Sequence, residues 1–339
     1  MRLETETENM PENRFQHIGE GSPVTKEQAL RLLSIKNLSP EYFRLLSQAC
    51  ESARRRYGQK GYIFVQIGLD SSPCRRNCRF CSIARCNHEN GERKETSLEE
   101  ILSAVKDIDF TKVTALFLMT TAEYDPEHFL QIGRAVREHI PEHIALVANT
   151  DDFDAAYGRK LRQAGFTGVY HVVRLREGED TDVASEVRVA TLDAAQAAGL
   201  RLYYCVEPIG PEHSYEELVT EMMRAREYHV DVMAVMRRVN VPNTKFEAKG
   251  MIDDYEFAKI AAVTQLVVMP EVSMNVHEPS LVAMLGGVNQ LYAEIGVNPR
   301  DMSRKTEHGR GYSVNEAAQM LRNVGYLPCI ERQPQKSAE

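Results

Sequence analysis

The strongest constraint on the fold is a repeated alternation of short apolar runs with longer helical patterns, from residue 62 to residue 323. The run 113–119 is continuously apolar, which is typical of a strand buried on both faces of a sheet. About eight strand–helix units follow one another, and such alternation indicates a parallel sheet with right-handed crossovers. Eight units in roughly 250 residues predict an α/β protein with a (β/α)8 barrel of the TIM type. An open doubly wound sheet is the alternative.

The individual elements can be placed from apolar spacing and from helix-capping residues. Two helices are expected within 25–58, separated by a break before Pro40. A capping box at 96–99 predicts the next helix, which should run to about residue 107. The later helices are expected at 126–139, 154–164, 186–198, 214–228, 253–268, near 281 and at 314–323. The strands are expected at 62–67, 113–119, 144–148, 168–173, 200–206, 232–236, 272–276 and 290–294.

One domain with two tails is expected. Residues 1–22 are polar, which predicts a disordered N-terminal tail; 23–330 should form the barrel domain, and 331–339 a flexible C-terminal tail. No apolar stretch reaches the roughly 18 residues of a membrane span, and the N-terminus lacks the apolar core of a signal peptide. We therefore expect a cytoplasmic protein that binds no membrane. The net charge of −8, with both signs interspersed, argues against a nucleic-acid partner.

Three cysteines lie close together directly after the first predicted strand, with the spacing C-x3-C-x2-C: Cys74, Cys78 and Cys81. This loop falls at the carboxyl end of a strand, where barrel enzymes place their catalytic residues. Thiolates are soft ligands that suit iron–sulfur clusters, zinc or Cu(I). Three of them can bind three irons of a cuboidal cluster and leave the fourth iron open for a ligand. Three arginines on the loop would offset the cluster's negative charge: Arg75, Arg76 and Arg79.

Two other interpretations of these cysteines stay open. Free cysteines are often buried in cores, although a loop rich in arginine and asparagine is an unusual place for them. A zinc site is the stronger alternative, and Cys86 or His88 could supply its fourth ligand. In that case the chain would be a zinc-stabilised binding protein without catalytic activity.

The C-x3-C-x2-C loop, with the aromatic Phe80 before its last cysteine, resembles the signature of the radical S-adenosylmethionine (SAM) superfamily. The resemblance implies that the three cysteines hold a [4Fe–4S] cluster whose fourth iron binds SAM, with Phe80 beside the cofactors. One electron from the reduced cluster would cleave SAM into methionine and a 5′-deoxyadenosyl radical. That radical would abstract hydrogen from a small-molecule substrate, and flavodoxin or ferredoxin would supply the electron.

Within the superfamily, residues 25–326 look like the branch that contains biotin synthase, methylornithine synthase and the hydrogenase maturase HydE. The likeness is carried by 29–33 and 53–58 in the leading helices and by 96–101 after the cysteine loop. It implies a radical SAM enzyme of cofactor or metabolite biosynthesis.

The same likeness assigns contacts to SAM. Glu123, after the second strand, is expected near the SAM amino group. Glu177, or Glu179 in a rival register, is expected near the ribose or amino group. Arg188 is expected to bind the SAM carboxylate, because a guanidinium fork suits that partner.

Cys205 matches the position of one auxiliary [2Fe–2S] ligand of biotin synthase, whereas other auxiliary positions fall near Leu118 and Val147. Sulfur insertion like that of biotin or lipoyl synthase, with a cluster anchored partly by Cys205, is therefore kept as an alternative. A single strand cysteine is otherwise a packing residue. Cys50 falls on the apolar stripe of a helix and is expected in the core.

The last third of the chain looks most like the HmdB-type subgroup, through 236–244, 275–279 and 286–301. Those radical SAM proteins are associated with assembly of the [Fe]-hydrogenase guanylylpyridinol cofactor. They are typified by a C-x5-C-x2-C loop, so a lipoyl-type or other cofactor precursor is an equal alternative. His277 and Glu278, together with Arg237, Arg238 and Arg300, could form a pocket for a carboxylate or phosphate. The expected substrate residues are Cys205, Arg237, Arg238, His277, Glu278 and Tyr292.

Overall fold

The computed structural model of the protein describes residues 23–87, 93–241, 243–277, 279–294 and 312–329. The predicted tails, together with His88, Glu278 and Arg300, lie outside these ranges.

Nine parallel strands form one sheet in the described part of the chain. They are β1 (Lys60–Gly68), β2 (Ala115–Met119), β3 (Ala145–Asn149), β4 (Gly168–Tyr170), β5 (Arg201–Ile209), β6 (Val232–Arg237), β7 (Ser273–His277), β8 (Gln290–Glu294) and β9 (Leu327–Pro328).

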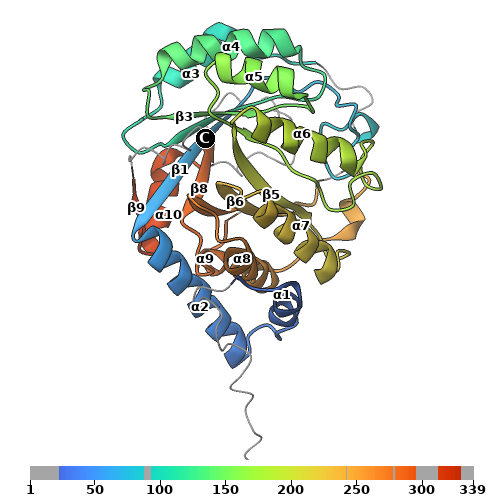
Figure 1. Cartoon of the computed structure of the whole chain (residues 1–339), viewed down its shortest axis with the longest axis vertical. Coiled ribbons are helices and arrows are strands. Elements are labelled where there is room, and N and C mark those ends of the chain that lie inside the picture. Colours follow the sequence, from blue (N-terminus) through green and yellow to red (C-terminus); the bar gives the residue numbers. More distant parts are fainter. Residues whose placement is uncertain (1–22, 88–92, 242, 278, 295–311, 330–339) are drawn as a thin grey trace, which may run out of the picture.

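Helices follow and surround these strands (Figure 1). They are α1 (Lys26–Leu33), α2 (Pro40–Tyr57), α3 (Leu98–Lys106), α4 (Pro126–His139), α5 (Ala155–Gln163), α6 (Ser185–Ala197), α7 (Tyr215–Glu227), α8 (Asp254–Val268), α9 (Leu281–Met284) and α10 (Val314–Asn323), with short 3-10 helices at Arg85–Asn87 and Glu247–Lys249.

Strands β1 to β8 close into a barrel. The order runs from β2 through β8 to β1, and β1 also pairs with β2, for example Phe64 with Ala115. The predicted (β/α)8 barrel is thus confirmed, and the open sheet is excluded. The two-residue β9 pairs with the outer start of β1 and was too short to be expected.

The two N-terminal helices cover α8. Both α1 and α2 pack against α8, which is buried from Phe257 through Val268. A helix with neighbours on all sides needs apolar residues all round, and this helix has them. Figure 1 places α1 and α2 at one end of the molecule, where they cover α8 and α9.

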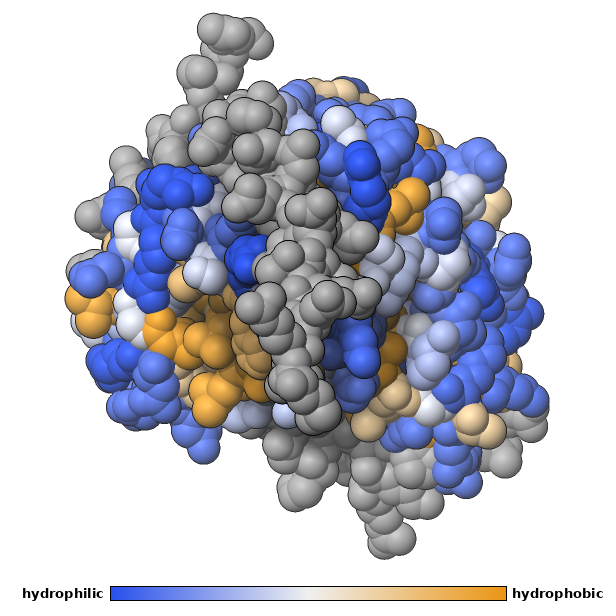
Figure 2. Space-filling view, turned by 90° about the horizontal axis from the view of Figure 1, so that it is seen from below, coloured by the Kyte–Doolittle hydropathy of each residue, from blue (hydrophilic) through white to orange (hydrophobic). Residues whose placement is uncertain are grey.

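An exposed apolar area lies on that same end. Figure 2 shows apolar side chains gathered among mostly hydrophilic ones on the face seen from below. Phe43 in α2 and Leu285 after α9 are about half exposed, and they line a shallow hollow together with Cys50. Cys50 is therefore half-buried at the surface, and its expected place in the core is wrong. No described helix is long and apolar enough to cross a membrane.

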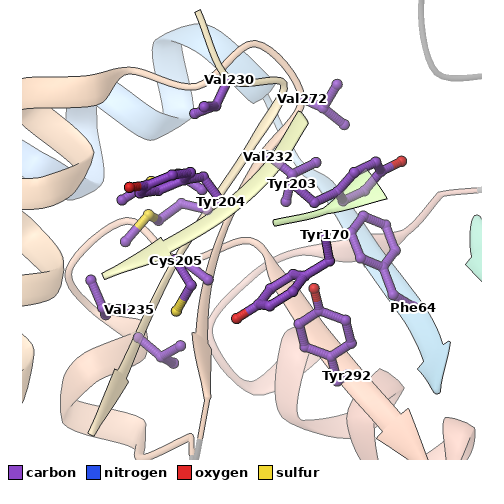
Figure 3. Packing of buried hydrophobic residues seen from close by; sticks show 14 of the residues in the cluster. Phe64, Tyr170, Tyr203, Tyr204, Cys205, Val230, Val232, Val235, Val272 and Tyr292 are labelled. Atoms are coloured by element: carbon purple, nitrogen blue, oxygen red, sulfur yellow. The ribbon is translucent and has the colours of Figure 1, made fainter. Parts of the chain in front are cut away.

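Aromatic side chains fill the middle of the barrel. The rings of Phe64, Phe117, Tyr203 and Tyr292 come from four strands, and their contacting centroids lie 5.2–5.9 Å apart. Figure 3 shows three of them, with Tyr170 and Cys205 nearby. Gly168 is required beside this layer, because a Cβ there would lie 2.5 Å from the Tyr203 ring. The layer makes the barrel centre a packed core.

Candidate active site

The cysteine loop, residues 74–86, follows β1 at the carboxyl end of the barrel. Two backbone hydrogen bonds close it: Cys74 N donates to Ile83 O (2.8 Å), and Arg85 N donates to Cys74 O (3.0 Å). The loop is therefore a defined turn, and its first cysteine has a fixed backbone.

A neighbouring segment after β4 supports the same loop. Asn77 has a left-handed backbone with φ of 47°, which asparagine tolerates better than most residues. Its side chain accepts from Cys86 N (2.9 Å) and donates to Asp182 Oδ2 (2.7 Å). Arg79 N also donates to Asp180 O (2.9 Å). The spacing between the cysteines is thus held from two sides.

All three cysteines line one cavity of about 260 Å³ at the carboxyl ends of the strands. Phe80 lines it too and packs near Phe246, with ring centroids 6.5 Å apart. The thiols named by the sequence therefore face a common space, together with the aromatic residue of the loop.

The donor set suits a cluster better than a single ion. No three His, Cys, Asp or Glu side chains in the described ranges are close enough to share one metal ion. The zinc alternative has no ligand set there: Cys86 does not line the cavity, and His88 lies outside those ranges. A cuboidal cluster binds each thiolate on a different iron, so three separated thiols around one cavity fit it.

The buried thiol of Cys78 needs a positive partner to ionise. Burial raises its pKa to about 12, and the neighbouring Arg174 opposes that shift. Thiolate, not thiol, is the metal ligand, so binding of iron would have to release this proton.

Glu123 lies beside the cysteine loop. Its Oε1 accepts hydrogen bonds from Arg75 N (3.0 Å) and Arg85 Nη2 (3.2 Å). The two residues before it, Thr121 and Ala122, line the cavity, whereas Glu123 does not. In this structure Glu123 anchors the loop, and its contact with SAM stays a prediction.

The structure brings Arg188 and Glu177 together. Arg188, in α6, is 4% exposed and lines the cavity, and its Nε lies 3.3 Å from Glu177 Oε2. That contact is not aligned for a hydrogen bond, so among the described residues this buried Nε has no acceptor. Glu177 accepts from Arg174 N (2.9 Å) and Thr181 Oγ1 (2.6 Å). An unsatisfied guanidinium donor beside the cysteines fits a carboxylate ligand such as that of SAM.

Three buried acids at the site were not expected from the sequence: Asp70, Asp152 and Glu207. Burial favours a raised pKa for Asp152, but the neighbouring His171 and the charge of Arg188 outweigh it. The pKa of Asp152 is held well below its usual value. This carboxylate is therefore a fixed negative charge behind the cavity wall.

Glu207 had the clearest missed signal, because it is a carboxylate inside an otherwise apolar strand. Its Oε2 accepts from Tyr170 OH (2.5 Å), and its Oε1 lies 3.3 Å from Arg174 Nε. All three residues line the cavity. Asp70, also in the lining, accepts from Thr121 N (2.7 Å).

The two predicted substrate arginines line the cavity but already have partners. Arg237 Nη1 lies 2.5 Å from Asp254 Oδ1, and Arg238 Nη2 lies 3.0 Å from Glu212 Oε2. Both guanidinium groups thus have carboxylate partners, as that of Arg188 does. A phosphate or carboxylate pocket that includes this pair stays a prediction.

The other predicted substrate residues divide into two groups. His277 lines the cavity and stacks on Tyr292, with centroids 4.4 Å apart and planes at 25°. Tyr292 belongs to the aromatic layer below. Cys205 is fully buried, with Sγ 3.6 Å from Val206 O. The described cavity lining includes neither Tyr292 nor Cys205, which favours packing as the role of that cysteine.

Comparison with known proteins finds biotin synthases that are similar in sequence to this chain. The chain is 24% identical over 290 residues to the biotin synthase of Desulforudis audaxviator (strain MP104C), which covers 80% of this chain and 86% of that protein. It is 25% identical over 304 residues to the biotin synthase of Rippkaea orientalis (strain PCC 8801 / RF-1), which covers 85% and 80%. No protein-family model matches the chain.

Solved structures share the fold. The crystal structure of methylornithine synthase (PylB) superposes with a TM-score of 0.80 at 18% identity, covering 93% of this chain and 97% of that one. HydG, a maturase of the [FeFe]-hydrogenase, gives a TM-score of 0.80 at 17% identity, covering 94% and 75%.

Proposed function

Because this chain is a radical SAM enzyme of the branch that includes biotin synthase, HydE and methylornithine synthase, with a [4Fe–4S] cluster and SAM as cofactors, we propose that its three loop cysteines hold the cluster and that Arg188 binds the SAM carboxylate. One observation carries the assignment. The three thiols and the buried guanidinium of Arg188 face the same cavity.

The protein's own residues have three tasks in this function. When bound, the cluster and SAM supply a carbon radical that abstracts a hydrogen atom from substrate. The cysteine loop and α6 position the two cofactors on one wall. The aromatic layer below and the cavity walls keep water away from the reactive centre. An external reductant such as flavodoxin or ferredoxin provides the electron.

The substrate is a small-molecule precursor in cofactor or metabolite biosynthesis. A cavity of about 260 Å³ suits a small ligand rather than a macromolecule. The sequence likeness of the last third to HmdB-type proteins favours a precursor of the guanylylpyridinol type, with a lipoyl-type or other cofactor precursor as an equal alternative.

Sulfur insertion has less support. Leu118 and Val147 are fully buried apolar residues near the places of auxiliary ligands, and Cys205 is fully buried and does not belong to the cavity lining. A second cluster would therefore lack a set of thiolates, and sulfur transfer from one would lack its source.

Anaerobic reconstitution with iron and sulfide tests the proposal. We expect about four irons per chain and release of 5′-deoxyadenosine from SAM with dithionite. Cys78→Ala should lose both, whereas Cys50→Ala, at the opposite end of the molecule, should keep both. Clearly more than four irons that fall in Cys205→Ala would favour sulfur insertion instead. A colourless protein with one zinc would contradict the proposal.

A further inference from the structure

The structure assigns a positioning role to Asp152, the carboxylate that follows β3: we propose that it fixes Arg188 for SAM and couples it to the cysteine loop. This inference rests on the proposed function, because it concerns the same SAM site. Asp152 itself does not line the cavity, so it acts through its partners.

Asp152 holds Arg188 with both of its oxygens. Arg188 Nη1 donates to Oδ1 and to Oδ2, each at 3.2 Å. Thr191, one turn along the same helix, donates its hydroxyl to Oδ1 at 3.3 Å. His171 Nε2 lies 3.2 Å from Oδ1. Thr191 of α6 and His171, the residue after β4, thus help to define where this carboxylate lies, and the carboxylate defines where the guanidinium lies.

Burial makes this arrangement stiff. The side chain of Asp152 is 7% exposed and that of Arg188 is 5% exposed. A buried charge is strongly destabilised when its partner leaves, so neither side chain can swing away at low energetic cost. With Nη1 bound to Asp152, the remaining guanidinium donors keep one orientation toward the cavity.

The same carboxylate reaches the cysteine loop. Arg76 Nη2 lies 2.8 Å from Asp152 Oδ2, and Arg76 Nε lies 2.7 Å from Asp151 Oδ1. Arg75 Nη2 also lies 2.6 Å from Asp151 Oδ2. Alternating charges therefore run from the loop that carries the cysteines to the arginine that faces SAM. The chain of ion pairs sets the distance between the cluster wall and the carboxylate site.

The deciding measurement is the dissociation constant for SAM, taken by equilibrium dialysis on the iron-reconstituted protein. Asp152→Asn keeps the shape of the side chain and removes its charge. We expect about tenfold weaker SAM binding with an unchanged iron content, a size typical of lost support behind a ligand-binding residue. Asp193→Asn is the matched control, because this carboxylate of the same helix accepts a hydrogen bond from Tyr228 OH (2.6 Å) and does not line the cavity.

A double variant separates positioning from a general structural effect. If Asp152 acts through Arg188, then Asp152→Asn should weaken SAM binding no further in an Arg188→Gln background. Independent losses that multiply, or a wild-type dissociation constant in the single variant, would overturn the inference. If Asp152→Asn does not fold, Thr191→Val removes one bond to the carboxylate and should weaken SAM about twofold. Wild-type protein that holds iron but no SAM would instead refute the proposed function.

Discussion

Glu177 is an acidic residue that is buried because its neighbours satisfy its carboxylate. Its side chain is 1% exposed, and it accepts from a backbone N–H and a hydroxyl while lying beside Arg188. Glu179, the rival in the sequence register, is exposed. The motif alone could not choose between two glutamates spaced two residues apart, because burial depends on how the loop after β4 turns.

Glu177→Gln should lower the free energy of unfolding by about 1–2 kcal/mol, because one of the two buried oxygens that accept from Arg174 N and Thr181 Oγ1 becomes an amide donor. Chemical denaturation of the iron-free protein measures this. Glu179→Gln should change it little. Equal effects of the two substitutions would contradict the burial described here.

Arg237 and Arg238 show where single residues escape prediction. Both were correctly expected at the end of β6, where strand ends meet the site. Their partners, Asp254 and Glu212, belong to α8 and to the turn before α7. Spacing along the chain says nothing of such pairs, so the carboxylate partners of the two arginines could not be predicted.

At the scale of elements, capping residues made the helices predictable. The bounds of α4 and α10 agree with the prediction to the residue. The start of α3 was expected from a capping box at 96–99, but Ser97 caps the helix and Glu100 closes the box. Thr96, a residue equally able to cap, instead donates to Gly68 O. β4 is also shorter than predicted, since the chain leaves the sheet to build the cavity wall.

Ser97→Ala should therefore destabilise the protein by about 1 kcal/mol, because the backbone N–H of Glu100, in the first turn of the helix, loses its acceptor. Thermal or denaturant unfolding checks the change. Glu100→Ala should also destabilise, whereas Glu99→Ala should not. A larger loss of stability for Glu99→Ala than for Glu100→Ala would instead support the capping box expected at 96–99.

The loop after β4 is joined to α7 by an ion pair that senses pH. Burial favours a raised pKa for Glu217, but the hydrogen bond from Arg176 (2.7 Å) and those from Ser214 outweigh it and lower the pKa from 4.5 to about 2. A lowered folded pKa stabilises the protein above about pH 4.5, and that contribution disappears as the pH falls toward 2.

The wild-type protein should therefore lose its stability advantage over Glu217→Gln between about pH 4.5 and 2. The advantage is about 1 kcal/mol or less, since the pair is partly exposed and screened by solvent. Denaturant unfolding at a series of pH values gives the difference. A gap that stays constant with pH would show that this carboxylate is not coupled to folding.

At the scale of the whole molecule, the number of strand–helix units favoured the barrel. Continuous apolar strands require cover on both faces, which a closed barrel and an open doubly wound sheet both give. The pairing of β1 with β2, which decides between them, depends on long-range contacts. The layer inside the barrel was not predictable. Phe64, Phe117, Tyr203 and Tyr292 are far apart in sequence, and only strand register brings them together.

Phe117→Ala should cost about 3–5 kcal/mol, because its ring contacts three other aromatic rings from three strands. Tyr292→Phe, which removes only a hydroxyl from the same layer, should cost much less. Guanidinium unfolding compares the two. Similar small losses would mean that the barrel centre tolerates a cavity.

The aromatic layer also affects how small molecules reach the cavity. The cavity lies at the carboxyl ends of the strands, where the cysteine loop borders it, and the aromatic rings fill the barrel centre below it. On β1 and β5, Gln66 and Glu207 are the lining residues nearest along the chain to Phe64 and Tyr203 of the layer. Whatever settles there must arrive first and depart last, and initial-rate kinetics should accordingly show an ordered rather than a random sequence of addition.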